Sequence, residues 1–240
     1  MRDKEWSPLS KEIACKSVVP FTVETDRLLL LDFTEGNQSL RADILDDTAA
    51  FTSYIDQQLL HADARYGIGG YAEHRTVYSR SKVFDAKEGV EPRRLHLGID
   101  IWGLAGTPVS APLDGIVHSF AFNDQFGDYG ATIILEHHMP AGIFYSLYGH
   151  LSLQDLKGLE KGQCIPAGQA FAHFGKPVEN GHWPPHLHFQ LILDMEGKAG
   201  DYPGVCAWSE RERYLRNCPD PDCLLGMMAY AKTSFTNQQR

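Results

Sequence analysis

Residues 186–193 read HLHFQLIL, a segment whose first residues alternate between polar and apolar side chains. In a strand, His186, His188 and Gln190 would lie on one face of a sheet and the apolar residues between them on the other. Four further strand-like segments come earlier in the chain: LGIDIW (97–102), GIVHSFAF (115–122), ATIILEHH (131–138) and GIFYSLYGHL (142–151). Because glycine and proline separate them and no long helical pattern intervenes, we predict a mainly β domain over residues 91–200, with an antiparallel sheet, sandwich or barrel.

The segment before this domain is predicted to be a mixed α/β flanking region over residues 1–90. RLLLLDF (27–33) reads as a buried strand. Residues 47–64 read as an amphipathic helix, because apolar residues recur every four positions from Phe51 onward. Asp47 stands at the start of this pattern, where its side chain can cap the first turn.

The segment after the domain, residues 201–240, is predicted to be an irregular extension that packs on it and includes a short helix at 224–231. Three of the five cysteines of the chain lie there, namely Cys206, Cys218 and Cys223. The cysteines form no CxxC pair, and an odd number cannot all pair within one chain, so we interpret them as buried thiols. A disulfide or a metal knuckle among these three is the alternative.

The composition is that of a globular protein that does not bind nucleic acid. Of 240 residues, 43% are apolar and 22% are charged, and the net charge is −9, whereas nucleic-acid binders usually carry a basic stripe. No stretch approaches the roughly 18 apolar residues of a membrane-spanning helix, so we expect no transmembrane segment. As written, the start (residues 1–21) lacks the apolar core of a signal peptide, which by itself favours the cytoplasm.

Histidine is abundant, and nine of the eleven histidines lie beyond residue 90. Two spacings are of interest, His96-x-x-x-Asp100 and His186-x-His188. On one face of a strand, the two imidazoles of the second motif would lie about 7 Å apart at Cα and could converge on one small volume. Buried together without a partner they would be costly to desolvate, and a metal ion would satisfy both.

His96 and Asp100 can serve one ion only if the chain bends between them. Four residues of straight strand span about 13 Å, whereas each ligand atom must lie about 2 Å from a zinc ion. Gly98 is the residue that permits a bend. Two histidines, one carboxylate and a free position are the ligand count of a catalytic zinc site, although Co²⁺, Mn²⁺ or Fe²⁺ also fit. The alternative is that these are capping or core histidines that share a sheet by accident.

From about residue 94 to 194 the chain resembles the lysostaphin-type (LytM-like) zinc metalloendopeptidases. The matching segments come in the family's order: HLGIDIW (96–102), VSAPLDGIVH (109–118), YGATIILEHH (129–138), YSLYGHLS (145–152), LEKGQCIPAGQ (159–169) and PPHLHFQ (184–190). The resemblance implies an antiparallel sheet or half-barrel groove of the LytM-like type (duplicated hybrid motif), with one zinc ion per chain at its floor.

The resemblance also implies a role for five residues. His96, Asp100 and His188 would bind zinc, and His150 and His186 would flank the metal-bound water. Zinc-bound hydroxide would then hydrolyse a peptide bond, with stem or cross-bridge peptides of peptidoglycan as the expected substrates. Since the chain has no HExxH glutamate, a histidine must move protons, and a pKa near 6.5 suits that task. One of the two flanking histidines is expected to be the general base and the other to stabilise the oxyanion; which does which stays open.

The sequence departs from the family's pattern at three points. The usual HLHFE reads HLHFQ, with Gln190 in place of the acid. The usual small glycine-serine loop before HLH is replaced by FGKPVENGHWPPHLH (174–188), whose Trp183 and two prolines would reshape the cleft. Family members usually act in the periplasm or cell envelope, whereas the chain as given shows no leader. These departures put the substrate in doubt rather than the metal site.

Two other classes of function compete with hydrolysis. APLDG (111–115) and KGQCIPAGQ (161–169) resemble the half-barrel repeat of lipoyl and phosphocarrier domains, but such carriers need neither YGHL nor HLH. An inactive regulator of another wall hydrolase is the second alternative, although such relatives typically lose ligands. Residues 1–90 could also cover the zinc, as an upstream segment does in latent family members. The GIGGYA text (67–72) lacks the strand context of a dinucleotide fingerprint.

The remaining histidines are given structural interpretations. His137 and His138 read as the end of a strand, and His118 and His173 as structural residues, whereas His182 lies where it could touch a substrate. Five aromatic residues near the motifs are expected to pack mainly in the core, with one or two lining a peptide groove; they are Trp102, Phe126, Tyr129, Tyr148 and Trp183.

Overall fold

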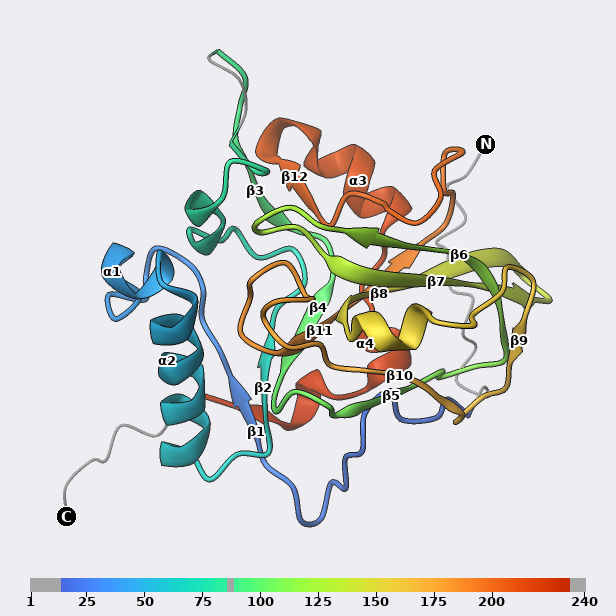
Figure 1. The fold of residues 1–240 in the computed structure, drawn as a ribbon, viewed down its shortest axis with the longest axis horizontal. Coiled ribbons are helices and arrows are strands. Elements are labelled where there is room, and N and C mark those ends of the chain that lie inside the picture. The colour runs from blue at the N-terminus through green and yellow to red at the C-terminus, as the bar shows by residue number, and fades with distance from the viewer. Residues whose placement is uncertain (1–13, 86–88, 234–240) are drawn as a thin grey trace.

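The computed structural model describes residues 14–85 and 89–233 and is built around one large β-sheet (Figure 1). The strands of this sheet are β1 (Leu28–Leu30), β2 (Tyr66–Gly69), β4 (Ile99–Trp102), β6 (Gly115–Asn123), β7 (Gly130–Met139), β8 (Gly142–Leu151), β9 (Cys164–Ile165), β11 (His186–Ile192) and β13 (Ala231–Lys232). Their order is β13-β1-β2-β4-β11-β8-β7-β6-β9. All pairings from β2 to β9 are antiparallel, which confirms the predicted mainly β fold. Of the N-terminal segment 1–21, residues 1–13 lie outside the described residues.

Strand β11 is buried along its whole length. Leu187, Phe189 and Leu191 are fully buried in the main core, as their alternation predicts. The opposite face of the strand is buried as well, because every residue from His186 to Ile192 is shielded from solvent. Polar side chains on that face are therefore enclosed by the segments that flank the domain, which creates the setting for a site.

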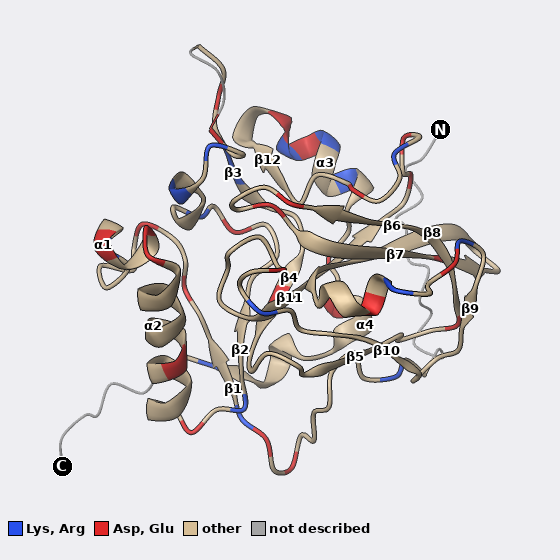
Figure 2. Ribbon diagram, viewed as in Figure 1, with Lys and Arg blue, Asp and Glu red and all other residues tan. Residues whose placement is uncertain are grey.

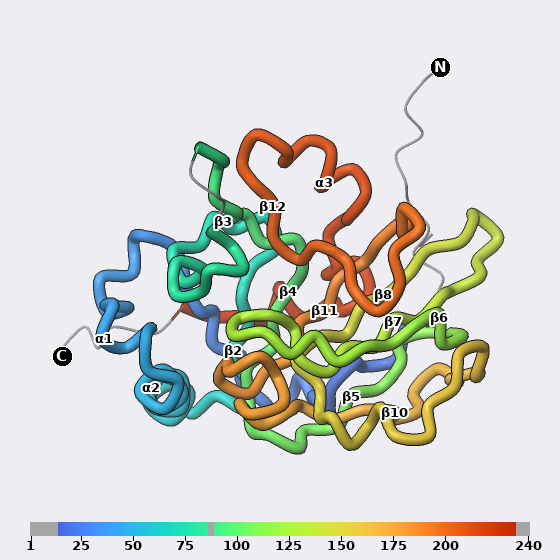
Figure 3. Tube along the Cα trace, turned by 45° about the horizontal axis from the view of Figure 1, so that its top comes forward, coloured from blue at the N-terminus to red at the C-terminus, as the bar shows by residue number. Residues whose placement is uncertain are grey.

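The N-terminal flank is part of the sheet rather than a separate body. The predicted strand is present as β1, somewhat shorter than expected, and it pairs in parallel with both β2 and β13. The predicted helix is confirmed as α2 (Thr48–His61), whose first turn is capped by the Asp47 carboxylate accepting from two backbone N–H groups. Phe51 of α2 is buried against the ring of Trp102 on β4, at 6.0 Å between centroids. Figures 1 and 3 show α2 at the β1 side of the molecule, far from β6.

Short elements complete the fold. Two of them form a small sheet, β5 (Pro108–Ser110) with β10 (Ala170–His173), and another is formed by β3 (Arg93–His96) with β12 (Val205–Ala207). The others are α1 (Ala42–Leu45), η1 (Val77–Arg80), η2 (Leu153–Leu156), η3 (Trp208–Glu210) and α3 (Arg211–Asn217). The pairing of β3 with β12 brings the C-terminal extension alongside His96.

The single helix predicted at 224–231 is wrong. The chain instead forms α4 (Asp222–Leu225), η4 (Met228–Tyr230) and then strand β13. Gly226 ends the first turn with φ of 58°, a left-handed conformation that terminates helices. The Asp222 carboxylate then accepts hydrogen bonds from the backbone N–H groups of residues 227 and 228, at 2.8 and 2.9 Å.

The large sheet contains strands from all three predicted segments of the chain, so it crosses the boundaries expected near residues 90 and 200. That division of the chain stays a prediction. Charged residues lie mainly on loops and helices, and both signs follow each other along α3 (Figure 2). Among residues 14–85 and 89–233, no helix has the length and apolar character needed to cross a membrane.

Candidate metal and catalytic site

Adjacent strands at the centre of the sheet carry the predicted site residues. Strand β4 contains Asp100, and β11 contains His186 and His188, with His188 directly opposite Asp100 in the antiparallel register. On its other side β11 pairs with β8, which contains His150. His96 is the last residue of β3. The fold therefore brings together five residues that are spread over more than 90 positions of sequence.

The predicted bend between His96 and Asp100 is present, because the chain leaves β3 and enters β4 in a different sheet. Gly98 lies at this crossing. A Cβ atom there would lie 2.6 Å from Cε1 of His188 and 2.7 Å from the carbonyl oxygen of Phe189. Glycine is thus needed because the His188 ring packs directly against the backbone, not only because the chain bends.

One ring nitrogen of His96 is hydrogen-bonded to the backbone. Its Nδ1 lies 3.0 Å from the carbonyl oxygen of Gly70, which can only accept, so Nδ1 carries the proton and Nε2 offers a lone pair. Burial, followed by the nearby charge of Arg75, lowers the pKa of His96 to about 4. The ring is consequently neutral near pH 7 and Nε2 is available as a ligand atom.

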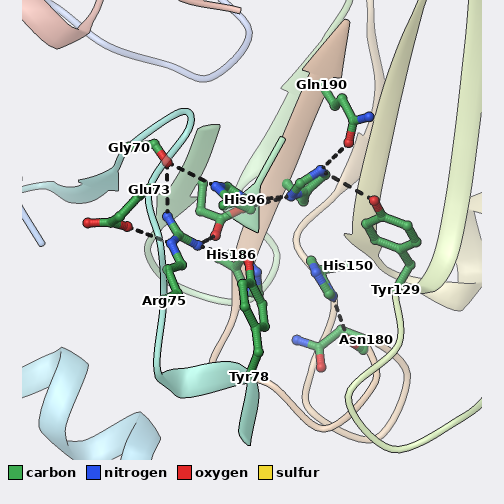
Figure 4. Close-up of polar contacts among 12 residues, drawn as sticks. Gly70, Glu73, Arg75, Tyr78, His96, Tyr129, His150, Asn180, His186 and Gln190 are labelled. Carbon is green, nitrogen blue, oxygen red and sulfur yellow. Dashed lines mark hydrogen bonds and ion pairs between the residues drawn. The ribbon is translucent and has the colours of Figure 1, made fainter. Parts of the chain in front are cut away.

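His188 is oriented through Gln190 (Figure 4). The side-chain N–H₂ of Gln190 donates to the carbonyl oxygen of Pro203 at 3.1 Å and to the sulfur of Cys218 at 3.3 Å. Its Oε1 is therefore the atom that lies 2.9 Å from Nε2 of His188, and it accepts a hydrogen bond from the N–H at Nε2. Nδ1 of His188 is left as the lone pair that faces the site. The departure from the family's acid thus preserves an acceptor for this histidine.

Three lone-pair-bearing atoms converge at one point. Nε2 of His96 lies 2.9 Å from Nδ1 of His188, and Oδ1 of Asp100 lies 3.2 and 3.0 Å from these two nitrogens. All three residues are buried, at 3% exposure or less. Acceptors placed this close repel one another unless a cation or a proton lies between them. Two neutral imidazoles and a carboxylate are a donor set that Zn²⁺ accepts, so the residues present fit the metal that the resemblance implies.

The second carboxylate oxygen of Asp100 has a different partner. Nη1 of Arg75 donates to Oδ2 of Asp100, and Nε of Arg75 donates to Glu73 at 2.6 Å. Burial acts to raise the pKa of Asp100, but its charged surroundings, with the Arg75 guanidinium as the hydrogen-bonding cation, hold that pKa well below its usual range. The carboxyl group is therefore ionised. Arg75, 1% exposed and part of the YAEHRTVY text (71–78), was not predicted from the sequence.

His150 and His186 share one arrangement of their ring nitrogens. Nδ1 of His150 donates to the carbonyl oxygen of Asn180 and Nδ1 of His186 to that of Pro184, each at 2.8 Å. Each Nε2 is left as a proton acceptor. Burial, followed by the neighbouring His186, holds the pKa of His150 well below its usual value. Burial also lowers the pKa of His186, to about 4, and its ring stacks on Trp102 at 3.8 Å between centroids.

The backbone at His150 has φ of 63°, a left-handed conformation that is uncommon for a residue other than glycine. It is held by two hydrogen bonds, from the N–H of His150 to the carbonyl of Tyr129 at 2.8 Å and from the N–H of Gly175 to the carbonyl of His150 at 2.9 Å. Such strain persists only where the surroundings enforce it. The imidazole of His150 lies beside that of His186, with 4.1 Å between the ring centroids.

Four of the five predicted residues, Asp100, His150, His186 and His188, line a pocket of about 120 Å³, whereas His96 is not among its lining residues. Three parts of the chain line it: the sheet, residues of the N-terminal flank such as Tyr78 and Phe84, and the C-terminal stretch 201–205. Tyr129, Trp102 and Trp183 are the aromatic residues from the predicted set that line the pocket. Tyr148 packs in the core instead.

The other histidines have the following positions. His137 lies inside β7, which continues to Met139, so the strand is longer than the sequence predicted. It is fully buried and bonds to the carbonyl of Asp114 and the hydroxyl of Ser146. His118 contacts Ser119, His173 contacts Asp155, and His182 stacks on the exposed Phe126.

The prediction that the cysteines are buried thiols is correct for two of them and wrong for two. Cys206 and Cys218 are buried free thiols, whereas Cys164 and Cys223 are exposed; Cys15 is intermediate. Cys164 belongs to β9, the last strand of the sheet, where one side has no covering strand. None of the five is in a disulfide.

Comparison with known proteins bears on this geometry. The model of peptidase family M23 matches residues 94–201, the segment that contains four of the five site residues in strands β4, β8 and β11 and the fifth at the end of β3. Residues 94–201 are thus similar to peptidase family M23. The predicted family resemblance is therefore confirmed for this segment.

Two of the curated proteins to which the chain is similar are bacterial peptidases. The chain is 31% identical over 150 residues to the L-Ala–D-Glu endopeptidase of Bacillus subtilis, covering 59% of this chain and 44% of that protein. It is 30% identical over 130 residues to the DD-carboxypeptidase/endopeptidase Mpg of Neisseria meningitidis, covering 52% and 27%. The chain thus spans less than half the length of these relatives.

Among solved structures, the catalytic domain of lysostaphin from Staphylococcus simulans is 23% identical to this chain. The match covers 52% of this chain and 81% of that domain, with a TM-score of 0.35. Arg75 and the other pocket residues of the N-terminal flank lie before the M23 match, and residues 202–205 lie after it. The pocket is accordingly formed by the M23 segment together with residues on both sides of it.

Proposed function

We propose that this protein is a zinc-dependent metalloendopeptidase whose metal is held by His96, Asp100 and His188. The observation that supports this most directly is the convergence of Nε2, Oδ1 and Nδ1 of these residues within 3.2 Å of one another. The hydrogen bonds to Gly70 and Gln190 leave both nitrogens unprotonated toward the site. An arrangement of three buried acceptors is unfavourable without a cation, so it argues against accidental core histidines.

The chain's own residues prepare this site before any metal is present. The backbone and Gln190 orient the two imidazoles, and the surrounding segments exclude water from the ligand side. Zinc, when bound, supplies a Lewis acid that polarises a peptide carbonyl and lowers the pKa of a water molecule to about 7. Three protein ligands leave a position open for that chemistry.

His150 and His186 are proposed to move the protons. Both keep Nε2 as an acceptor, and both line the same pocket as Asp100 and His188. One of them would accept a proton at Nε2 from the attacking water, and the other, when Nε2 carries a proton, would donate it in a hydrogen bond to the oxygen that gains charge in the transition state. Because Nδ1 of each ring is tied to a carbonyl, neither ring can flip without losing a buried hydrogen bond.

The proposed substrate is a peptide, with peptidoglycan stem or cross-bridge peptides as the first class to examine. The names of the curated relatives, an L-Ala–D-Glu endopeptidase and a DD-carboxypeptidase/endopeptidase, support this choice. In this proposal residues 91–200 are the peptidase domain, 1–90 its N-terminal flank and 201–240 its C-terminal extension. A carrier module or an inactive regulator would have no need of five histidine and aspartate side chains arranged in this way.

Metal analysis of the purified protein, beside the Asp100→Ala variant, tests the proposal. About one zinc per chain in the wild type, absent from the variant, together with cleavage of peptidoglycan peptides, is the expected result. Wild-type protein that takes up no zinc even when it is supplied would exclude the metallopeptidase and favour a carrier. Zinc uptake without cleavage of any peptide would favour a regulator.

A further inference from the structure

Arg75 is the most deeply buried charged residue beside the proposed metal site, and it divides the two oxygens of Asp100 between two tasks. Nη1 of Arg75 donates to Oδ2 of Asp100, whereas Oδ1 faces His96 and His188. Figure 4 shows the guanidinium of Arg75 between Glu73 and the histidine cluster. The Arg75 side chain is 1% exposed, so water does not compete for these hydrogen bonds.

The position of Arg75 is set by the fold and not by a mobile contact. Strand β2 pairs with β4, with Gly69 opposite Asp100, and the chain then turns so that the N–H of Arg75 donates to the carbonyl of Arg94 at 2.8 Å. A Cβ atom at Gly69 would lie 2.9 Å from Nη2 of Arg75. A glycine at position 69 is therefore what leaves room for the guanidinium beside the strand that carries Asp100.

Glu73 completes the arrangement by holding the other edge of the guanidinium. It accepts from Nε of Arg75 at 2.6 Å and is 16% exposed. A guanidinium is planar, stays protonated and presents its N–H donors in fixed directions. The hydrogen bond from Nε to Glu73 therefore also fixes the direction in which Nη1 donates to Asp100. The contact with Asp100 is thus directional rather than a general attraction between charges.

We propose that Arg75 is a positioning residue, which holds Oδ2 of Asp100 so that Oδ1 is the one carboxylate oxygen offered to the metal. This inference rests on the proposed function, because it assumes that Asp100 is a ligand. It assigns to a residue before the M23 segment a part in the metal site of that segment. A carboxylate freed from this contact could bind through both oxygens or rotate away from the histidines.

The experiment compares three full-length variants with the wild type. Arg75→Met removes the charge and keeps the apolar stem, and Arg75→Lys keeps a charge but has a single ammonium in place of the fork. Arg94→Met is the matched control, since Arg94 lies on neighbouring β3 and pairs with Asp85, away from the pocket. Zinc affinity is measured by competition with a chelator, and the visible absorption of the cobalt-loaded protein reports the coordination number. Circular dichroism checks folding.

The expected result is roughly 10–100-fold weaker zinc binding in Arg75→Met, as for other residues that orient ligands, with a changed cobalt spectrum and no change in Arg94→Met. Arg75→Lys is expected to be intermediate. Wild-type affinity and an unchanged spectrum in folded Arg75→Met would overturn the proposal. If that variant does not fold, the same result in Arg75→Lys would overturn it.

Failure of the proposed function can be told apart from failure of this inference. Wild-type protein that binds zinc but cleaves no peptide would contradict the peptidase, whereas the affinity ratio would still decide the role of Arg75. Wild-type protein that binds no zinc would overturn both.

Discussion

The imidazole rings of His150 and His186 lie with their centroids 4.1 Å apart, one on β8 and the other on β11. Each donates from Nδ1 to a carbonyl oxygen, so the two Nε2 atoms have the same protonation and the two rings are chemically alike. The two rings differ in what holds them in place. His186 stacks on Trp102, whereas His150 is carried by a strained backbone position. Because of this difference, the two histidines can be tested with different substitutions.

Replacing His150 should remove activity but leave the metal. We expect His150→Ala to keep one zinc and to lose about 10²–10⁴ in kcat, the usual contribution of a positioned acid or base. His150→Asn is a useful second variant, because asparagine tolerates the left-handed backbone of this position. Metal content and steady-state kinetics are the measurements.

His188→Ala provides the opposite pattern and is expected to lose both zinc and activity. His118→Ala, on β6 and in contact with Ser119, should change neither and serves as the control. Loss of zinc in the His150 variant would contradict the division between ligands and proton carriers that we propose.

Restoring the family's acid at position 190 should destabilise this protein. In Gln190→Glu, a carboxylate would face the carbonyl oxygen of Pro203, which now accepts a hydrogen bond from the amide. A buried polar group without its partner costs about 1–3 kcal/mol. The free energy of unfolding, measured with urea on the metal-free protein, should fall by that amount. Gln169→Glu makes the same change on the exposed surface and should have little effect. Equal stability of both variants would show that Pro203 does not need the amide donor.

The stability of the fold should fall on mild acidification, in part through His137. Burial lowers the pKa of this histidine, which is 0% exposed on β7. The unfolded chain therefore takes up a proton near pH 6.5 before the folded protein does, so the stability is present above that pH and is lost as the pH falls toward the folded pKa. One such group contributes a slope of at most about 1.4 kcal/mol per pH unit.

His137→Gln should reduce this slope by up to one proton, as judged by urea unfolding between about pH 7.5 and 5.5. The comparison of slopes is independent of any loss of stability that the substitution itself causes. Other buried histidines titrate in both proteins and cancel in the difference. Identical slopes in the two proteins would mean that His137 keeps an ordinary pKa in the folded state.

Gly98→Ala should impair zinc binding by displacing a ligand. The added methyl group would meet the ring of His188 at 2.6 Å and a carbonyl oxygen at 2.7 Å, and overpacking of this kind costs about 1–3 kcal/mol. Zinc affinity is expected to fall more than the stability of the metal-free protein, because the ring moves while the sheet persists. A variant that binds zinc like the wild type would indicate that β4 can shift to relieve the contact.

Local patterns were sufficient to predict one strand of the site and one helix of the N-terminal flank. The alternation in HLHFQL predicts the two faces of β11, and Asp47 with the spacing from Phe51 predicts α2. Both elements depend on residues that are close together in the sequence, so their patterns can be recognised without the structure. The ligand and proton-transfer roles of His96, Asp100, His150, His186 and His188 stay predictions, although the fold brings these side chains together.

Features that depend on distant pairings were not predictable. The contact of Arg75 with Asp100 requires β2 to pair with β4, and nothing in the YAEHRTVY text indicates that partner. Likewise, β13 becomes a strand only because β1 offers it an edge. The protonated nitrogen of His188 depends on Gln190, and through it on a carbonyl from the C-terminal extension.

The parallel pairing of β13 with β1 has a consequence for how the molecule assembles. Leu28 and Ala231 are register partners, more than 200 positions apart in sequence. During synthesis on a ribosome, β1 emerges early. It can pair with β13 only after almost all of the described chain has been synthesised. Contacts of such long range form slowly, because the loop between them must close first. We therefore expect this edge of the sheet to be completed after the other strands of the sheet have paired.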